Sequence, residues 1–521
     1  MAQIIDDPER QVIPRWRVFS QAAAFGEISS LKLRSPDAFT DEMLAPVLED
    51  WKREPGLSVA ADVVSASLAI GRPAAAKEAA KFLLSNEDAP PLARELAERC
   101  LGIGTPGPSP STAAANASEP GSESEYREAI HKNRARLSSY PINPVLWTNQ
   151  AFLFTTLGQR SSAEHAMRVA LGLAPDNRFV ARAGCRLFLH TGDVEKAHDV
   201  LLRVSSLLTD PWILAGELAV ASVRKRTSRH MKKAQKMAED QMIPPFHLSE
   251  LVGALASAES NSGNLKKARK LSVQSLVDPA ENAIAQARYF SRQLGVEDWK
   301  PPQAARWQSS EANAHIASTK GEFELALVQA KQWQAEQPFS SRPANLAGYL
   351  AMTVFEEYAE AERLLMRGLR SNRTDFVLYN NLAFALANMG RLQEAQENLN
   401  EGRRLPLTKR DHIFLTATQG LIAFRAGHPE MGRKYYAQAI ASAEKEDGLK
   451  WAVGVAKSYL AVEELRLRSQ HAAAAEKQAL EAIGVLNQPF RELFAKKLRT
   501  IQERQQPPII EARASSNRRI F

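Results

Sequence analysis

The chain has 521 residues, of which 44% are hydrophobic and 24% are charged, and this balance is typical of a folded protein. Its length is too great for one compact core of ordinary size, so we expect several domains or an elongated array. The formal charge of +8, from 67 basic and 59 acidic residues, is too small for this length to identify a partner.

No stretch approaches the roughly 20 apolar residues that a membrane-spanning helix needs. The first residues, MAQIIDDPERQVIPRWRVF, lack the basic and then apolar pattern of a secretory signal. We therefore predict a cytoplasmic protein without membrane contact. Cys100 and Cys185 are too few for a disulfide framework or for a zinc site built from cysteines. Two buried thiols are favoured over a single bridge between them.

Residues 1–101 are predicted to form a small N-terminal helical module. Apolar residues recur at helical spacing on both sides of Gly71, namely Ala60, Val63, Val64, Ala76, Ala80 and Leu83. Residues 102–125 follow, with the sequence GIGTPGPSPSTAAANASEPGSESE, and are rich in glycine, proline, serine and alanine. Because this composition cannot bury enough apolar surface to fold, it predicts a flexible linker.

A pattern of two helices joined by a tight turn follows the linker and is clearest around Gly390. Leu382 and Leu386 lie eight and four residues before this glycine, and Ala395 and Leu399 lie five and nine residues after it. Each set forms an apolar stripe along one helix. The glycine supplies the left-handed backbone conformation that ends the first helix at little steric cost.

The same pattern recurs along the chain in steps of 34 to 37 residues, with one longer step between positions 263 and 321. Its turn positions are Gly158, Gly192, Arg226, Gly263, Gly321, Glu356, Gly390 and Gly427. This period, with its alternation of small and large apolar residues, resembles the tetratricopeptide repeat. The longer step predicts an additional helix and a proline-containing connection.

The resemblance covers about residues 143 to 488 and implies an all-α fold, in which helix pairs stack into a right-handed superhelix (an α-solenoid). We assign residues 126–488 to this superhelix. In the resembled family the first helix of each pair lines the concave face, where peptides usually bind. Residues 489–505 are predicted to form an amphipathic helix that caps the last repeat, and residues 506–521 a disordered tail.

Motifs that would indicate an enzyme are missing from the sequence. It contains no GxxxxGK[ST], GxGxxG or HExxH motif and no paired metal-ligand spacing. We therefore assign no catalytic, cofactor-binding or metal-binding residue and predict a protein that is not an enzyme.

The repeat around Gly192 carries candidate binding residues on the first of its helices. Arg182, Arg186 and His190 are spaced four residues apart, so they share one face of this helix, and Arg224 comes from the next repeat. Guanidinium groups in such a cluster suit a carboxylate, an acidic peptide or a phosphate. The alternative is a solvated face with salt bridges inside the repeats.

Two further sets of residues would lie on the concave face. Asn149 and Asn381 come nine residues before their turn glycines, where the resembled family often holds the backbone of a ligand. Toward the C-terminus the face is apolar, with the residues Leu350, Phe384, Leu421 and Phe424. This apolar part would bind a hydrophobic segment of a partner or be buried against the chain's own tail.

A second candidate surface is basic. The segments RKRTSRHMKK at residues 224–233 and LKKARK at residues 265–270 would lie on neighbouring repeats. They would form a basic ridge with the residues Lys225, Arg226, Lys232, Lys233, Lys266, Lys267, Arg269 and Lys270. Such a ridge suits nucleic-acid phosphates or an acidic protein. Aromatic side chains for base stacking are missing nearby, and a solvated edge is the alternative.

We predict a non-enzymatic scaffold or adaptor that binds a protein or peptide partner, acidic in the case of the arginine cluster, in its concave groove. The alternative prediction is a nucleic-acid-associated regulatory protein that uses residues 224–236 and 266–270. Substitution of the groove arginines would abolish binding in the first case, and a steep loss of affinity with salt would mark the second.

Overall fold

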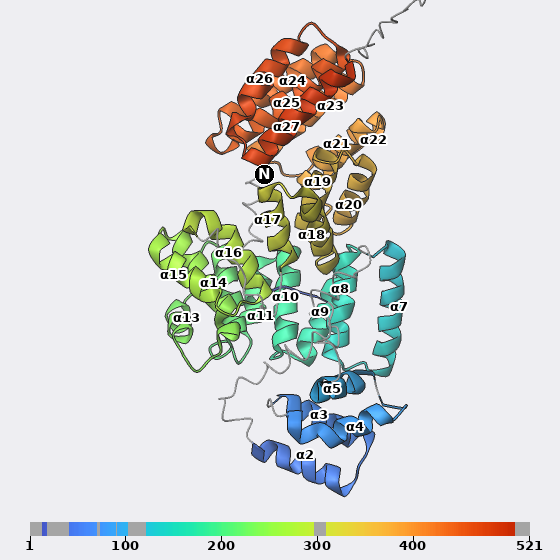
Figure 1. The fold of residues 1–521 in the computed structure, drawn as a ribbon, viewed down its shortest axis with the longest axis vertical. Coiled ribbons are helices and arrows are strands. Elements are labelled where there is room, and N and C mark those ends of the chain that lie inside the picture. Colours follow the sequence, from blue (N-terminus) through green and yellow to red (C-terminus); the bar gives the residue numbers. More distant parts are fainter. Residues whose placement is uncertain are drawn as a thin grey trace, which may run out of the picture. The chain divides into compact units, whose positions relative to one another are not determined.

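The computed structural model describes residues 13–17, 41–69, 73–89, 91–102, 121–295 and 309–505, and all regular secondary structure in these ranges is helical (Figure 1). The predicted all-α fold of stacked helix pairs is therefore confirmed. The chain divides into two compact units. Unit 1 comprises Met1–Asn313 and Lys331–Ser340, and unit 2 comprises Ala314–Ala330 and Ser341–Phe521.

The described part of the N-terminal module contains four α-helices and the short 3-10 helix Pro73–Ala76, with a hydrophobic core of their own. The α-helices are α2 (Asp41–Arg53), α3 (Leu57–Ala69), α4 (Lys77–Ser85) and α5 (Pro91–Leu101). The six apolar residues that the sequence pattern selects here are all fully buried in that core. Gly71, on which the pattern was centred, lies outside the described residues.

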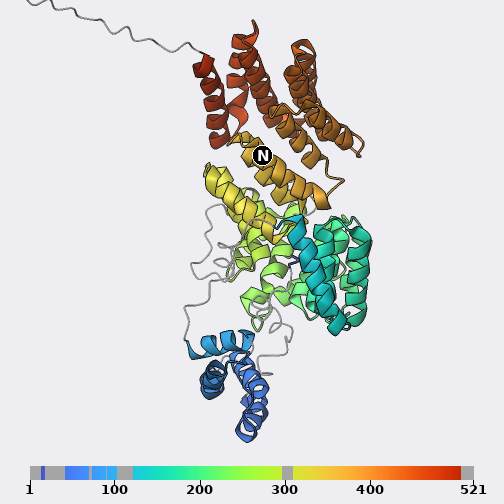
Figure 2. The ribbon, with the colours of Figure 1, turned by 90° about the vertical axis from the view of Figure 1, so that its right-hand side faces the viewer.

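The repeats of unit 1 are built from antiparallel helix pairs, and one additional helix precedes them. In chain order the helices are α7 (Glu123–Ser139), α8 (Pro144–Thr156), α9 (Arg160–Leu173), α10 (Arg178–His190), α11 (Val194–Leu202), α12 (Pro211–Val223), α13 (Met231–Ala238), α14 (Pro245–Asn261), α15 (Leu265–Ser275) and α16 (Glu281–Leu294). Figures 1 and 2 both show α7 to α10 as neighbouring helices.

The helix α7 begins inside the segment predicted to be a linker. Ser122 caps it: its side chain accepts a hydrogen bond from the backbone of Glu125, whose carboxylate accepts one from the backbone of Ser122. This reciprocal pair satisfies two of the unpaired amides at a helix start. The expectation of a flexible linker is thus wrong for residues 123–125, and most of the predicted linker lies outside the described residues.

Short polar side chains set the start of several first helices. Asn143, Asn177 and Asp210 each accept hydrogen bonds from the amides of the first turn that follows. Proline follows directly at positions 144 and 211, where its missing amide hydrogen costs nothing. Each of these first helices therefore begins at a defined residue. Its starting point determines which of its side chains face the inside of the repeat.

The predicted turn glycines have the left-handed backbone that the pattern required. Gly158, Gly192, Gly263, Gly321, Gly390 and Gly427 have φ angles of 69° to 83°. Glu356 replaces glycine with a φ of 56°, as predicted. The prediction for Arg226 is wrong by one residue, because Lys225 is the residue with positive φ (55°). The turn after α12 is therefore reached one position earlier than strict periodicity requires.

Small residues at the contact between paired helices let their backbones approach. Ala151 of α8 and Ala163, Met167 and Ala170 of α9 are completely buried, and they belong to one cluster with Phe154. Cys185 is also fully buried, and burial raises the pKa of its thiol to about 12. Cys100 and Cys185 are both free thiols, which confirms the favoured alternative.

Unit 2 continues the helix pairs after the additional helix α16 that the longer step predicted. Its elements are parts of α17 (Ser310–Lys320) and α18 (Phe323–Glu336), then α19 (Ser341–Thr353), α20 (Tyr358–Ser371), α21 (Phe376–Asn388), α22 (Leu392–Arg403), α23 (Lys409–Arg425), α24 (Pro429–Glu444), α25 (Lys450–Leu467), α26 (Ala472–Ala482) and α27 (Gln488–Gln505). No described helix is long and apolar enough to cross a membrane.

The last helix, α27, packs on α25 as a capping helix would. Phe494 is almost fully buried against Tyr459, with ring centroids 5.7 Å apart. Phe490 of the same helix contacts Phe323, with ring centroids 5.2 Å apart. Lys497 forms an ion pair of 2.9 Å with Glu356, the residue of the left-handed turn. The bounds of α27 agree closely with the predicted helix at 489–505, and residues 506–521 lie outside the described residues.

Candidate functional site

A short non-helical segment near the N-terminus, Ile13–Arg17, is buried against the first helices of the unit 1 repeats. Pro14 lies against Gly216 of α12, where an added Cβ would be 3.2 Å from the proline ring. The backbone carbonyl of Ile13 accepts a hydrogen bond of 2.8 Å from Asn282 of α16. We call the surface that surrounds this segment the inner face of unit 1: helices α8, α10, α12 and α16 together with Glu311, Glu336 and Phe339.

An aromatic pocket in the inner face holds Trp16, which is 1% exposed. Its ring lies 5.3 Å from that of Phe152 on α8 and 5.5 Å from that of Phe339. Phe152 and Phe339 also contact each other edge to face, at 5.6 Å between centroids. Aromatic rings in this geometry attract one another beyond the gain from burial. The pocket therefore holds a flat aromatic side chain in a fixed orientation.

Three carboxylates of the inner face, Glu281, Glu311 and Glu336, surround the two arginines of the segment; we call them the acidic cradle. Arg15 is 3.0 Å from Glu281 and 2.7 Å from Glu311. Arg17 is 3.1 Å from Glu336 and also pairs closely with Glu281. The side chains of the acidic cradle are only 10% to 13% exposed. Ion pairs shielded from water in this way are stronger than pairs on an open surface.

The pKa values of the paired groups follow from burial and from these charges. Burial lowers the pKa of Arg15, but the carboxylates of Glu281, Glu311 and Glu336 outweigh it and leave the pKa raised. Burial and the charge of Glu281 raise the pKa of Glu336, while Arg17 and a 2.8 Å hydrogen bond from Ser310 act against this rise. The cation of Arg17 thus favours the ionised form of Glu336 against the effects of burial and of the charge of Glu281.

The predicted arginine cluster is not gathered into one site. Arg182 donates to both carboxylate oxygens of Glu250, at 2.9 Å and 3.1 Å, and to the carbonyl of Trp212. Arg224 ends α12 and pairs with Glu195 of α11, at 2.6 Å, so it does not join Arg182. Both arginines are therefore held by salt bridges between different repeats, and not by the salt bridges inside the repeats that were the stated alternative.

The other two members of the cluster lie behind the aromatic pocket. The guanidinium of Arg186 stacks over the ring of Phe339 at 5.1 Å, and the ring of His190 lies 5.4 Å from the same phenylalanine. They contact the residue that holds Trp16, so they support the inner face from α10. Their direct contact with a partner stays a prediction.

The remaining groove residues are found on first helices, as expected. Asn149 of α8 is buried, and Asn381 of α21 donates to Asn345 at 3.3 Å. Half-buried Phe384 contacts Tyr459 at 5.0 Å, and Tyr459 contacts Phe494 of α27. Leu350, Leu421 and Phe424 are buried. Phe384 is thus in contact with α25, whose Tyr459 also packs on α27. The tail, residues 506–521, lies outside the described residues, so burial of the apolar face against it stays a prediction.

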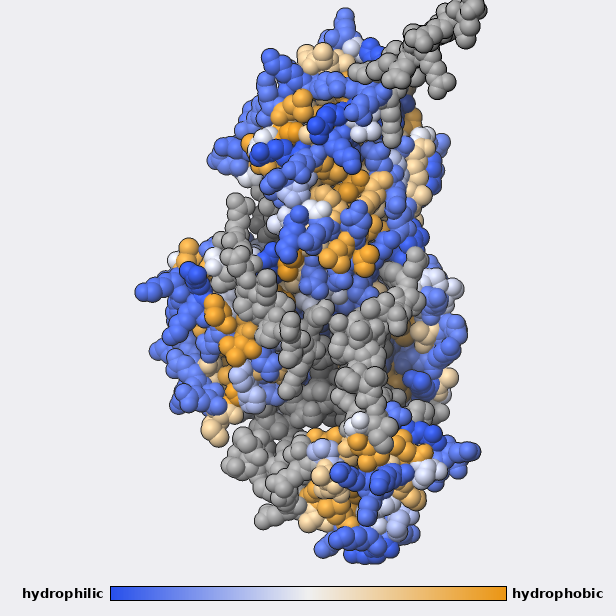
Figure 3. All heavy atoms as spheres, in the orientation of Figure 1, coloured by the Kyte–Doolittle hydropathy of each residue, from blue (hydrophilic) through white to orange (hydrophobic). Residues whose placement is uncertain are grey.

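The basic ridge is exposed to solvent. Its eight side chains lie on α13, on α15 and in the turn after α12, and all eight are exposed. Gln274 of α15 donates to the carbonyl of Ala238 at the end of α13, so the two helices are neighbours. The outer edge over these helices is hydrophilic in Figure 3. One ridge residue, Lys267, is paired with Glu259 at 2.6 Å.

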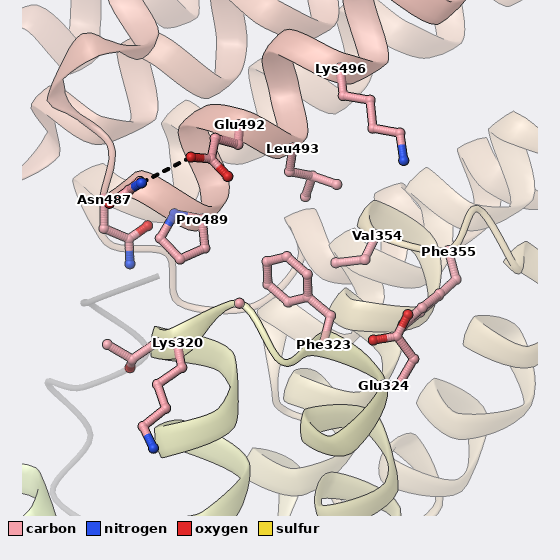
Figure 4. A pocket seen from close by; sticks show the side chains of 13 residues that line it. Lys320, Phe323, Glu324, Val354, Phe355, Asn487, Pro489, Glu492, Leu493 and Lys496 are labelled. Carbon is pink, nitrogen blue, oxygen red and sulfur yellow. Dashed lines mark hydrogen bonds between the residues drawn. The ribbon is translucent and has the colours of Figure 1, made fainter.

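Unit 2 contains an open pocket of about 860 Å³ beside the start of α27. Phe323, Val354 and Leu493 face its interior, and Lys320 points away (Figure 4). Among the described residues no group of histidine, cysteine, aspartate and glutamate is arranged to hold a metal ion. The pocket therefore has a mixed lining of apolar and polar side chains, which include Glu324 and Glu492.

What sequence reasoning missed is the occupied part of the inner face: the segment Ile13–Arg17, the acidic cradle and the aromatic pocket. The stretch IPRWR carries proline, two arginines and tryptophan within five residues, and this unusual composition was the available signal. Its partners lie up to 319 residues away in the sequence, so no local periodicity points to them.

Comparison with known proteins supports the repeat assignment. Residues 364–397 match the tetratricopeptide repeat family. Structures with similar helical arrays include the APC/C hetero-tetramer Cut9–Hcn1, with 12% identity over 90% of this chain and 95% of that chain and a TM-score of 0.34. Yeast Tom70 has 13% identity over 73% and 93%, with a TM-score of 0.27. The human IFIT1 dimer with PPP-AAAA has 14% identity over 90% and 96%, with a TM-score of 0.30.

At these TM-scores the overlays are loose, and nothing about a partner follows from them. No curated protein sequence matches the chain.

Proposed function

We propose that this tetratricopeptide-repeat protein is a non-enzymatic scaffold that binds a peptide segment of a partner protein on the inner face of unit 1. One observation carries the proposal: this face already encloses a five-residue segment through an aromatic pocket, ion pairs and a hydrogen bond to its backbone. A surface that can bury such a segment has the shape and chemistry for peptide recognition.

The charges of the inner face bear on the kind of partner. Arg182, which was expected to attract an acidic peptide, is neutralised by Glu250. The acidic cradle contributes three carboxylates to the same face. The partner segment is therefore expected to be basic where it meets the acidic cradle, and the earlier expectation of an acidic ligand is not favoured there.

The test compares partner capture by the full chain with capture by two charge-reversal variants. Glu281→Lys reverses a carboxylate of the inner face, and Glu397→Lys makes the same change at an exposed position of α22. A partner of the inner face is lost with Glu281→Lys and kept with Glu397→Lys. The captured protein is then purified and its affinity for each chain is measured by titration calorimetry. Equal affinity for both variants would show that the inner face does not bind it.

The basic ridge supports a second candidate function, contact with nucleic acid, because its eight side chains are exposed on adjacent elements. Neutralising several phosphates would make the affinity fall steeply with salt. Changing Lys232, Lys233, Lys266 and Lys267 to glutamate would then abolish binding of an oligonucleotide. Retention of the oligonucleotide by this variant would exclude the ridge.

A further inference from the structure

We propose that the inner face of unit 1 recognises a proline–arginine–aromatic–arginine sequence in a partner protein, and that Ile13–Arg17 is an internal copy of this ligand. The inference rests on the proposed function and specifies its ligand. The internal copy occupies the face until a partner segment displaces it.

The charge balance is the first argument. The acidic cradle provides three carboxylates, and the segment provides the guanidinium groups of Arg15 and Arg17. Largely buried charges are costly unless they are paired, so carboxylates at this depth require cations in place. Arginine suits them better than lysine, because its planar group donates in several fixed directions and here contacts two carboxylates at once.

The spacing of the charges is the second argument. Arg15 and Arg17 are separated by one residue, and both contact Glu281 while each has one further carboxylate partner of its own. Trp16 lies between the arginines in the sequence and enters the aromatic pocket. A ligand must therefore place an aromatic residue directly between two cations. This order is more specific than a general preference of an acidic surface for basic peptides.

The aromatic position has a defined chemical preference. The indole nitrogen of Trp16 is buried and has no hydrogen-bond partner among the described residues. A buried N–H group without an acceptor contributes nothing to binding and carries a desolvation cost. Phenylalanine, which lacks this group, should therefore be accepted at the same position, whereas a small side chain would leave the pocket empty.

The inner face also contacts the two residues before the first arginine, Ile13 and Pro14. Asn282 donates to the carbonyl of Ile13, which fixes the register of the segment along α16. Pro14 is in contact distance of the position that a Cβ of residue 216 would take, so glycine at this place makes room for the proline ring. Proline presents a rigid ring and has less freedom to lose on binding.

The internal copy competes by virtue of its covalent attachment. Arg17 and Glu281 are 264 residues apart, yet they belong to one chain, so the segment is present at a high effective concentration. A partner with the same sequence must overcome this advantage through additional contacts or a high local concentration. Weakening the internal copy should therefore increase the affinity for an external peptide.

The experiment measures binding of a fluorescein-labelled peptide, QVIPRWRVFSQ, to the full chain by fluorescence polarisation; its sequence is that of residues 11–21. The released variant, Trp16→Ala/Arg17→Glu, removes the aromatic ring and reverses one charge of the internal copy. We expect it to bind the peptide at least tenfold more tightly than the unmodified chain. A second released variant, Arg15→Ala/Arg17→Ala, should behave alike, and circular dichroism checks that both stay folded.

Specificity is tested in the released variant. Adding Glu281→Gln and Glu311→Gln should lower the affinity for the peptide at least tenfold, while adding Glu397→Gln, an exposed position of unit 2, should leave the affinity unchanged. A peptide with phenylalanine in place of tryptophan should bind within about threefold, and a scrambled peptide should not bind. Equal binding of the scrambled peptide, or affinity that does not depend on Glu281 and Glu311, would overturn the proposal.

Two other outcomes distinguish failure of the proposed ligand sequence from failure of the proposed scaffold function. If the peptide does not bind but Glu281→Lys still abolishes capture of a purified partner, the ligand sequence is wrong and the scaffold function stands. If light scattering shows a dimer that becomes monomeric in the released variant, the segment occupies the face of a second copy. That result would overturn the proposal of a foreign ligand.

Discussion

The indole ring of Trp16 meets the ring of Phe152 at an interplanar angle of 90°, with centroids 5.3 Å apart. These residues are far apart in the sequence, and their contact attaches an N-terminal segment to the first helix of the first repeat in unit 1. The attachment can be tested independently of any partner.

Trp16→Ala should detach the segment from the inner face. Removing a buried tryptophan costs about 3–5 kcal/mol, which is enough to favour local release of five residues without unfolding the repeats. Trypsin should then cleave after Arg15 and Arg17 at least about tenfold faster than in the unmodified chain, since proteolysis follows the open population. Mass spectrometry of timed digests measures this rate.

The control for this digestion is Ile142→Ala, because Ile142 is 78% exposed and lies outside the inner face. Its cleavage after Arg15 and Arg17 should match that of the unmodified chain. Unchanged cleavage in Trp16→Ala would mean that the aromatic pocket does not hold the segment.

The affinity of the inner face for an arginine-containing peptide should rise with pH. Burial and the charge of Glu281 raise the pKa of Glu336, and Arg17 lowers it. When no arginine occupies the position of Arg17, the pKa of Glu336 is no longer lowered by this charge. Glu336 therefore binds more protons in the vacant face than in the occupied face. Binding then releases protons and is favoured as the pH rises through the interval between the two pKa values.

Titration of the labelled peptide into the released variant between pH 4.5 and pH 8 measures this dependence. The affinity should be fully present above the pKa of the vacant state and should fall as the pH drops below it. Glu336→Gln should flatten the profile, because glutamine cannot take up the proton. An equally steep profile in Glu336→Gln would assign the dependence to another group.

How far the sequence predicts this molecule differs between its local and non-local features. The turns at Gly158 and Gly390 are predictable because a left-handed residue between two apolar stripes is a local constraint. The enclosure of Trp16 is not, because its partners belong to other helices and the segment has no period of its own. The spacing of Arg182 and Arg186 predicts that they share a helix face, but the neutralisation of Arg182 by Glu250, 68 residues later, depends on how the repeats stack.

The two kinds of turn residue make a matched pair of stability predictions. Lys225 has a φ of 55° and is exposed, so Lys225→Gly should relieve the strain of a left-handed non-glycine residue and stabilise the protein by about 0.5–1 kcal/mol. Gly192 has a φ of 82° with no atom within 4 Å of an added Cβ. Gly192→Ala should therefore cost about 1 kcal/mol through backbone strain alone.

Thermal unfolding of the two variants measures these effects as shifts of Tm in opposite directions. Lys225 is also part of the basic ridge, so Lys225→Ala serves as the control: it removes the charge and keeps the strain. If Lys225→Ala stabilises as much as Lys225→Gly, charge repulsion along the ridge, rather than the backbone, is responsible.

Arg182→Ala should reduce stability, because it leaves the carboxylate of Glu250 buried without its counter-charge. The side chain of Glu250 is only 4% exposed, and Arg182 donates to both of its oxygens. Removing one partner of a buried pair costs about 3–5 kcal/mol. Glu250→Gln in the same chain should recover much of this loss, since an amide is less costly to bury than a charge.

Thermal unfolding of the single and double variants, with Arg404→Ala as an exposed control, gives the coupling between the two residues. If Arg182→Ala is as stable as the unmodified chain yet loses its partner, Arg182 acts as a binding residue, as the sequence first suggested, and its pairing with Glu250 is secondary.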